Sequence, residues 1–173
     1  RDPEVLEKVG THFEARASTR FSNAANLYDA VTTADLVIGA VLIPGAAAPK
    51  LVTRETLKDM QKGAVLVDVA IDQGGCFETS RATTHADPTY VVDDVVHYCV
   101  ANMPGAVART STYALNNVTL PHALRIARMG WKDALAADPH LAEGLNVHKG
   151  EVTYEAVASE LGYDYRPVAD LLR

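Results

Sequence analysis

Hydrophobic residues along the first hundred positions alternate between helical and extended spacing. Leu6, Val9 and Phe13 recur at helical spacing after Asp2-Pro3, so we expect a helix over residues 3–13. The same spacing after Ser22-Asn23 predicts a second helix over residues 24–33. Residues 35–42 and 64–71 are instead almost continuously apolar, a pattern typical of strands buried on both faces of a parallel sheet.

The spacing of hydrophobic residues differs between the middle and the last third of the chain. In the middle, Thr53 is expected to cap a short helix between the two apolar runs, and residues 90–100 are rich in strand formers. From Thr110 onward only helical spacing remains, with a long helix interrupted or bent at Pro121 and no strand. The prediction is an α/β fold, part of a doubly wound parallel sheet over residues 1–106, followed by a helical tail over residues 107–173.

Composition and charge exclude several classes of protein. The 173 residues carry 16 Lys+Arg and 22 Asp+Glu, a net charge of −6 without long runs of one sign, which argues against nucleic-acid or polybasic membrane surfaces. The longest apolar run, residues 36–43, is too short to span a bilayer. The two cysteines form no CxxC pair, and the six histidines are scattered, so neither a disulfide framework nor a metal site is expected.

Several nucleotide-binding and hydrolase motifs are missing. No two of the eleven glycines are spaced i, i+2, so the dinucleotide fingerprint G-x-G-x-x-G does not occur. A phosphate-binding loop and a G-x-S-x-G elbow are missing as well. The residues alone therefore indicate the second half of a nucleotide-binding domain with a helical tail.

The ends of the predicted strands mark the candidate site, because ligands of open α/β sheets bind beyond the carboxyl ends of the strands. Two of the four ends are mostly apolar, and two bring Asp72 and Asn102 to the rim. We expect all four ends on one edge of the sheet: residues 21–22, 41–44, 70–75 and 100–104.

Asp72 is the most informative of these residues. A carboxylate placed directly after a buried strand needs solvent, a partner or a ligand, and Gly74-Gly75 allow the backbone to turn sharply or to approach a ligand closely. Capping of a turn or of the next helix explains Asp72 equally well. Asn102 is likewise either a turn former or a ligand-binding residue, and Asp68 is expected to make a structural hydrogen bond.

The strand-end motifs resemble those of the bacterial L-alanine dehydrogenases. The resemblance is carried by ADLVIGAVLIPG followed by APKLV, by GAVLVDVAIDQGG, by YCVANMP and by TSTYAL. It covers nearly the whole chain and corresponds to the C-terminal half of that family's polypeptide. It implies a Rossmann-like NAD-binding domain, here residues 1–106, and a return into the substrate domain, here residues 107–173.

The resemblance also implies an activity and an assembly. The family converts L-alanine to pyruvate and ammonia with NAD, reversibly, in the cytoplasm and commonly as a homohexamer. Asp72 matches the family's active-site aspartate, and Asn102 is expected to orient the nicotinamide or the substrate. The NAD contacts implied by the family fall on Ser22, Val41, Leu42, Val69, Ala70, Ile71, Asp72, Val100, Ala101, Asn102 and Met103.

Other family features have no counterpart in the sequence. The proton-shuttling histidine, the lysine and arginine that clamp the pyruvate carboxylate, and the glycine fingerprint belong to the half that would precede Arg1, so the chain is expected to be a fragment that is inactive by itself. One alternative is the NAD-binding α subunit of proton-translocating transhydrogenase, which typically carries Glu at the position of Asp72. Another is a non-catalytic NAD-binding or assembly module.

Overall fold

The computed structural model describes residues 2–172, with the side chain of Ala15 left out. The chain forms two compact units. Unit 1 contains the residues up to Val41 together with Pro49–Ala101, and unit 2 contains Leu42–Ala48 and the residues from Asn102 onward.

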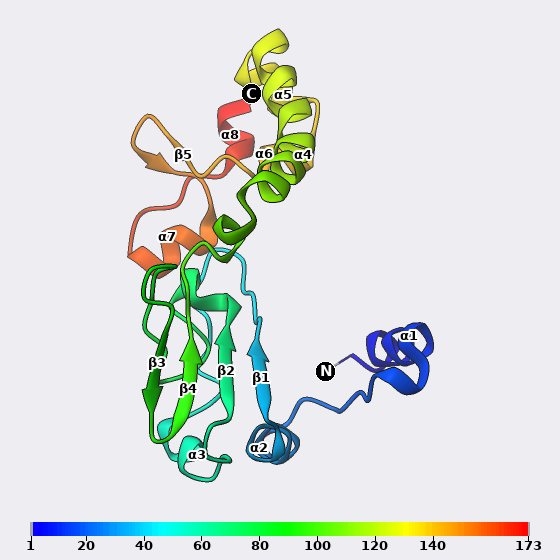
Figure 1. Cartoon of the computed structure of the whole chain (residues 1–173). Helices are drawn as coiled ribbons and strands as arrows, with labels where there is room; N and C mark the ends of the chain where they lie inside the picture. Colours follow the sequence, from blue (N-terminus) through cyan, green and yellow to red (C-terminus); the bar gives the residue numbers. More distant parts are fainter. Residues whose placement is uncertain (1, 173) are drawn as a thin grey trace. The chain divides into compact units, whose positions relative to one another are not determined.

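Unit 1 is built on a four-stranded sheet of order β1-β2-β4-β3 (Figure 1). The first three strands in that order run parallel, and β3 runs antiparallel to β4 at the edge. In the register Leu36 lies opposite Val65, and Val65 lies opposite Val96. The strands are β1 Leu36–Gly39, β2 Val65–Asp68, β3 Thr89–Val92 and β4 Val95–Tyr98. These contacts confirm the predicted α/β class with a parallel sheet.

Both apolar runs form strands, but the strands are shorter than predicted. β2 ends at Asp68 because its carboxyl group accepts hydrogen bonds from the Cys76 and Phe77 amides, and the chain curls to bring these amides back. The residues after it form the 3-10 turn η2, Val69–Gln73. The prediction of burial on both faces is wrong, because Leu36 and Ile38 of the edge strand β1 are 54% and 62% exposed, and alternate residues of β2 are only half-buried.

The strand-rich stretch before residue 100 is a hairpin. β3 and β4 are joined by Asp93 and Asp94, whose φ angles of 51° and 62° are both positive. Two positive φ angles in a row are the type I′ arrangement, which suits the right-handed twist of the strands. Without a glycine in the turn, the sequence did not signal the reversal, so only a single β-rich stretch was predicted.

The helices of unit 1 begin at capping residues. Asp2 accepts a hydrogen bond from Glu4 N, Asn23 from Asn26 N and Thr53 from Thr56 N, which satisfies amides that the first turn leaves unpaired. A 3-10 turn, η1 Glu14–Arg16, follows the first helix. The helices are α1 Pro3–Phe13, α2 Ala24–Thr33 and α3 Arg54–Lys58, which confirms the three predicted positions.

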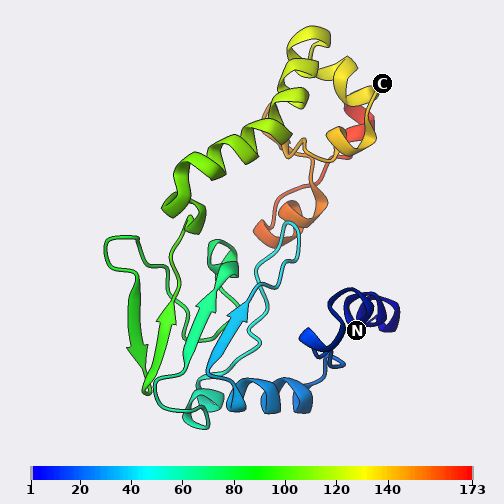
Figure 2. The same ribbon diagram turned by 45° about the vertical axis from the view of Figure 1, so that its right-hand side comes forward.

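The expected strand end at residues 21–22 is wrong. Residues 17–22 form no strand, since the segment is mostly polar and β1 pairs only with β2. These residues lead instead into α2, which lies at the end of the sheet where β1 begins (Figures 1 and 2). The carboxyl edge therefore receives three of the four predicted ends.

Unit 2 is mainly helical (Figure 1). The predicted long helix runs through Pro121 without interruption, and its described residues bury no side chain. A two-stranded hairpin, which the sequence pattern did not reveal, precedes α7. The elements are η3 Met103–Val107, α4 Ala108–Met129, α5 Trp131–Ala136, α6 Pro139–Ala142, β5 Val147–His148, β6 Glu151–Val152, α7 Glu155–Leu161 and α8 Val168–Leu172.

The helices within residues 2–172 differ in length or apolar character from membrane-spanning helices. None of them combines the length and the apolar character that crossing a bilayer requires.

Candidate functional site

The segment after β2 forms a tight turn at the carboxyl edge of the sheet in unit 1. Gly74 N donates to Ile71 O and Gly75 N to Ala70 O, each at 3.0 Å. Both glycines have left-handed φ angles, +89° and +74°. A Cβ on Gly75 would lie 2.7 Å from Asp68 Oδ2, so only glycine fits there without a shift. We call residues 69–75 the Asp72 turn.

The side chain of Asp68 anchors the segment that follows this turn. This side chain is fully buried, and Oδ2 accepts from Cys76 N at 2.9 Å, from Phe77 N at 3.4 Å and from Ser80 Oγ. The predicted structural hydrogen bond of Asp68 is therefore confirmed. A buried carboxyl group with several donors anchors both the end of β2 and the segment that returns toward it.

Burial shifts the titration of two neighbours of this anchor. Burial, together with the negative charge of Asp68, raises the pKa of the Cys76 thiol to about 12, so the thiol stays protonated and unreactive at neutral pH. Burial also lowers the pKa of His97. Its ring is held by Thr79 Oγ1 at 2.7 Å and Val95 O at 3.0 Å, contacts that belong to the core of unit 1.

The functional groups of the turn itself face outward or lack a partner. Asp72 is exposed, and no hydrogen bond or ion pair joins its carboxylate to another residue within 2–172. The alternative interpretation, in which Asp72 caps a turn or helix, therefore has no contact to support it. In the same range, Gln73 Oε1 is buried without a hydrogen-bond partner. Such an acceptor is costly unless a ligand or water donates to it.

The other predicted residues of unit 1 differ in what they offer a ligand. Val69 is 49% exposed, whereas Ala70, Ile71 and Val100 are buried and offer a ligand little surface. Val41 and Ala101 are half-buried. Ser22 is exposed but lies before α2, away from the carboxyl edge.

Three predicted residues belong to unit 2. Leu42 is 62% exposed, and Met103 is half-buried at the start of η3. Asn102 is exposed and has a left-handed φ of 57°, a conformation that asparagine tolerates better than most residues. The turn-forming interpretation of Asn102 is thus supported by its backbone conformation.

Sequence reasoning missed Lys50. Its ammonium donates to the carbonyls of Gly74 and Gly75, at 2.6 and 2.8 Å. One signal was available, because Lys50 is the single charged residue between Gly39 and Thr53. A lone charge in an apolar loop at the ligand edge of a sheet points to a specific contact.

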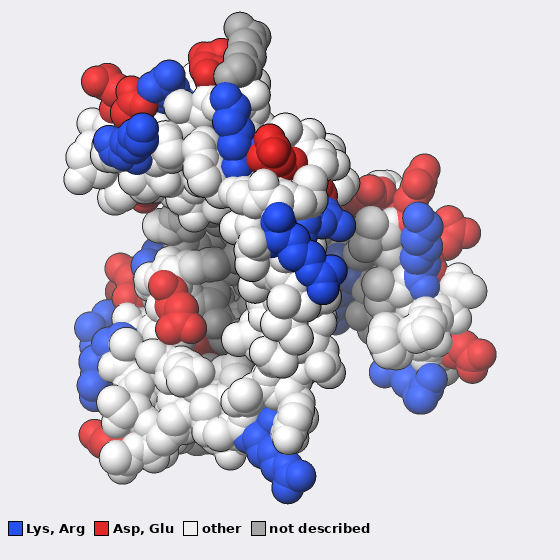
Figure 3. Space-filling model, turned by 90° about the horizontal axis from the view of Figure 1, so that it is seen from above, with Lys and Arg blue, Asp and Glu red and all other residues white. Residues whose placement is uncertain are grey.

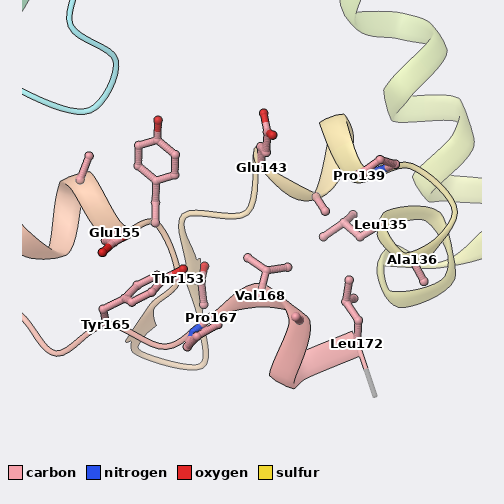
Figure 4. Close-up of a pocket in the computed structure, with 14 residues that line it drawn as sticks. Leu135, Ala136, Pro139, Glu143, Thr153, Glu155, Tyr165, Pro167, Val168 and Leu172 are labelled. Carbon is pink, nitrogen blue, oxygen red and sulfur yellow. The ribbon is translucent and has the colours of Figure 1, made fainter.

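Unit 2 contains a separate hollow of about 770 Å³ (Figure 4). Leu135, Val168 and Leu172 border it, and none of the predicted site residues does. Its lining is mostly apolar and includes the carboxylates of Glu143 and Glu155. The hollow is therefore not part of the candidate site.

Metal and nucleic-acid chemistry find no support. Within residues 2–172, no group of three His, Cys, Asp or Glu side chains could hold a metal ion. On the face seen in Figure 3, acidic and basic side chains lie interspersed rather than gathered into a patch of one sign. In the described part of the chain, the Asp72 turn is where an exposed carboxylate and an unpartnered buried acceptor occur together.

Comparison with known proteins identifies the family. Residues 1–155 match the family described as Alanine dehydrogenase/PNT, C-terminal domain. The chain belongs to this alanine dehydrogenase/PNT family. It is 63% identical over 167 residues to the alanine dehydrogenase of Halomonas elongata, which covers 96% of the chain and 45% of that protein. The chain thus spans less than half the length of the curated alanine dehydrogenases that it matches.

Solved structures of the family give the same result. An L-alanine dehydrogenase structure matches with a TM-score of 0.80 and 48% identity, covering 93% of this chain and 44% of that one. The transhydrogenase from Sinorhizobium meliloti matches with a TM-score of 0.60 and 30% identity, covering 89% and 40%. The first comparison confirms the Rossmann-type α/β class for this member of the alanine dehydrogenase/PNT family.

Proposed function

We propose that this chain forms the second half of the nicotinamide-nucleotide site of an NAD-dependent L-alanine dehydrogenase and provides its active-site carboxylate, Asp72. The observation that carries the proposal is the Asp72 turn. Its carboxylate is exposed and unpaired within the described residues, on a turn fixed by two glycines and the buried Asp68. The reaction is the reversible oxidation of L-alanine to pyruvate and ammonia.

The residues of the turn fit a nicotinamide nucleotide. The buried Gln73 Oε1 needs a donor, and a carboxamide N–H is a donor of the right type. A Cβ at Gly74 would meet nothing within 4 Å, and half-exposed Val69 offers an apolar surface to a flat ring. NAD would supply the hydride acceptor at this edge. Ser22, Val41, Leu42, Ala70, Ile71, Val100, Ala101, Asn102 and Met103 complete the proposed cofactor contacts.

Asp72 and Asn102 have separate proposed roles. Oxidation of an amine requires water to add to an iminium carbon and ammonia to leave, so several protons must move. The Asp72 carboxylate would hold the water or the ammonium in position and accept or return these protons. Asn102, with both a donor and an acceptor on its side chain, would orient the nicotinamide or the substrate.

The domain roles, assembly and location follow from the same proposal. We assign residues 1–106 to the NAD-binding domain and residues 107–173 to the return into the substrate domain. The assembly would be a homohexamer in the cytoplasm, with L-alanine or pyruvate and ammonia as its small-molecule partners. The exposed apolar residues of α4 support a role for this helix in contacts with other parts of the enzyme.

The transhydrogenase alternative is weaker. Both the identity and the TM-score of the Sinorhizobium meliloti transhydrogenase are lower than those of the L-alanine dehydrogenase structure. An aspartate rather than a glutamate also precedes the Gln-Gly pair in this chain. A non-catalytic module would not need the carboxylate at all.

The proposal is tested by completing the chain. A hybrid protein joins it to the preceding part of the Halomonas elongata alanine dehydrogenase, of which the chain matches 45%. The hybrid should oxidise L-alanine with NAD. Asp72→Asn should lower kcat by about 100-fold or more, since a positioned proton-transfer group contributes that much, and should leave the Kd for NADH nearly unchanged.

The control is Asp29→Asn on the exposed surface of α2, which should leave kcat unchanged. Near-normal turnover of Asp72→Asn would remove this residue from the mechanism. Tight NADH binding by the 173 residues alone would contradict the assignment of a half-site and favour a self-sufficient binding module. Fluorescence titration of NADH measures both affinities.

A further inference from the structure

Lys50 binds the Asp72 turn through its side chain. The ammonium Nζ donates to Gly74 O at 2.6 Å and to Gly75 O at 2.8 Å, so one charged group holds two successive carbonyls. Lys50 follows β1 in the chain, whereas the glycines follow β2, and all three belong to unit 1. Hydrogen bonds from a charged donor are shorter and stronger than neutral ones.

The main chain beside Lys50 is itself fixed. Leu51 N donates to Cys76 O at 2.7 Å, and Glu78 N donates to Val52 O at 2.9 Å. The segment after Lys50 therefore runs along the segment after the Asp72 turn, and Val52 and Phe77 form a parallel bridge. These contacts already fix the backbone at Lys50. Binding of the two carbonyls therefore costs less conformational entropy than it would if Lys50 lay on a mobile loop.

The glycine pair needs this support. Glycine loses more conformational freedom on folding than any other residue, and two glycines follow each other here in left-handed conformations. Asp68 holds the chain from Cys76 onward, and two amide bonds close the turn on its inner side. The carbonyls of Gly74 and Gly75 are held by Lys50.

We propose that Lys50 is a positioning residue for Asp72. Its ammonium fixes the orientation of the Gly74-Gly75 peptide groups and thereby the direction in which the Asp72 carboxylate points. The inference rests on the proposed function of Asp72 and adds to it a residue that does not touch the substrate itself. Methionine has nearly the length of lysine but cannot donate, so Lys50→Met removes the two bonds with little change in shape.

The first test uses the 173-residue chain and requires no activity. Amide hydrogen exchange followed by NMR should show exchange of Gly74 and Gly75 about tenfold faster in Lys50→Met, since lost charge-assisted bonds weaken the turn. Val96 N, which bonds Ala64 O at 2.9 Å between strands, should be unchanged. The control Lys58→Met removes a lysine that pairs with Glu55 of its own helix and should leave the exchange of Gly74 and Gly75 unchanged.

The second test measures catalysis in the hybrid protein. Lys50→Met should lower kcat about tenfold or more, because small displacements of a catalytic group have large effects on rate, while KM for L-alanine changes less than about threefold. Lys50→Arg, which keeps two donors and the charge, should restore most of kcat. The thermal midpoints of both variants should stay close to that of the parent.

The outcomes separate the two hypotheses. Unchanged exchange at Gly74 and Gly75 in Lys50→Met would overturn the role of Lys50 whatever the hybrid does. Faster exchange with an unchanged kcat would overturn positioning and leave a structural contact only. An inactive parent hybrid that binds NADH would contradict the proposed dehydrogenase function, and the exchange result would still decide whether Lys50 holds the turn.

Discussion

The two units use their apolar residues in opposite ways. Unit 1 buries large side chains in a core of its own, among them Leu57, Leu66 and Phe77. In unit 2, the 22 residues of α4 bury no side chain, and Tyr113 and Leu115 are more than 60% exposed. Large exposed apolar surfaces in natural proteins mark contacts with other parts or partners. Unit 1 therefore has a core of its own, whereas α4 is built to be covered.

The largest expected difference between the units comes from Asp68→Ala. The substitution leaves the buried Cys76 and Phe77 amides without an acceptor, so unit 1 should lose about 3 kcal/mol of unfolding free energy. Hydrogen exchange measured by mass spectrometry at increasing urea concentration resolves the two units. Peptides of unit 2 should keep their midpoint, and Asp29→Ala should have little effect. An equal loss in both units would show that they unfold as one.

Gly75→Ala should have a smaller effect on the same unit. A Cβ at this position would meet Asp68 Oδ2 and Ser80 Cβ at 2.7 Å and would sit at a left-handed φ, which together should lower the unfolding free energy of unit 1 by about 2 kcal/mol. Gly74→Ala is the matched control. It has the same sign of φ but open space around the Cβ, and should lower it by about 1 kcal/mol. Equal losses of unfolding free energy in the two variants would mean that the Asp68 side chain shifts to make room for the added Cβ.

The smallest effect is expected in α4. Leu115→Ala removes a side chain that is 63% exposed and should change the unfolding free energy of unit 2 by less than about 0.5 kcal/mol. The same substitution in unit 1, Leu57→Ala, removes a side chain that is 1% exposed and should lower stability by about 3 kcal/mol. Urea titrations of both variants provide the comparison. A loss above about 1.5 kcal/mol for Leu115→Ala would contradict an uncovered α4.

Local signals predicted the local structure of unit 1 well. Asp2, Asn23 and Thr53 cap helices where the sequence placed them, because capping depends on residues only two or three positions away. Strand lengths were overestimated, since apolar character continues beyond the last ladder bond. The Asp93-Asp94 turn was missed because its left-handed conformation is not encoded by a glycine.

The candidate site was predictable only where one residue carries the signal. Asp72 stands out after an apolar run, and the structure leaves its carboxylate exposed on a constrained turn. The pattern predicts Ser22 on the sheet edge because it leads one to expect a strand before this residue, and residues 17–22 form no strand. The bond from Lys50 to Gly74 joins residues 24 positions apart, and no periodicity reports such a contact.

The open edge of β1 affects how copies of the chain associate in solution. The strand contains neither a charge nor a proline, and its neighbours in the sheet lie on one side only. Charges, prolines and bulges are the devices by which proteins keep outer strands from pairing with those of other molecules. Pairing through this edge should therefore lead copies of the chain to associate as its concentration rises.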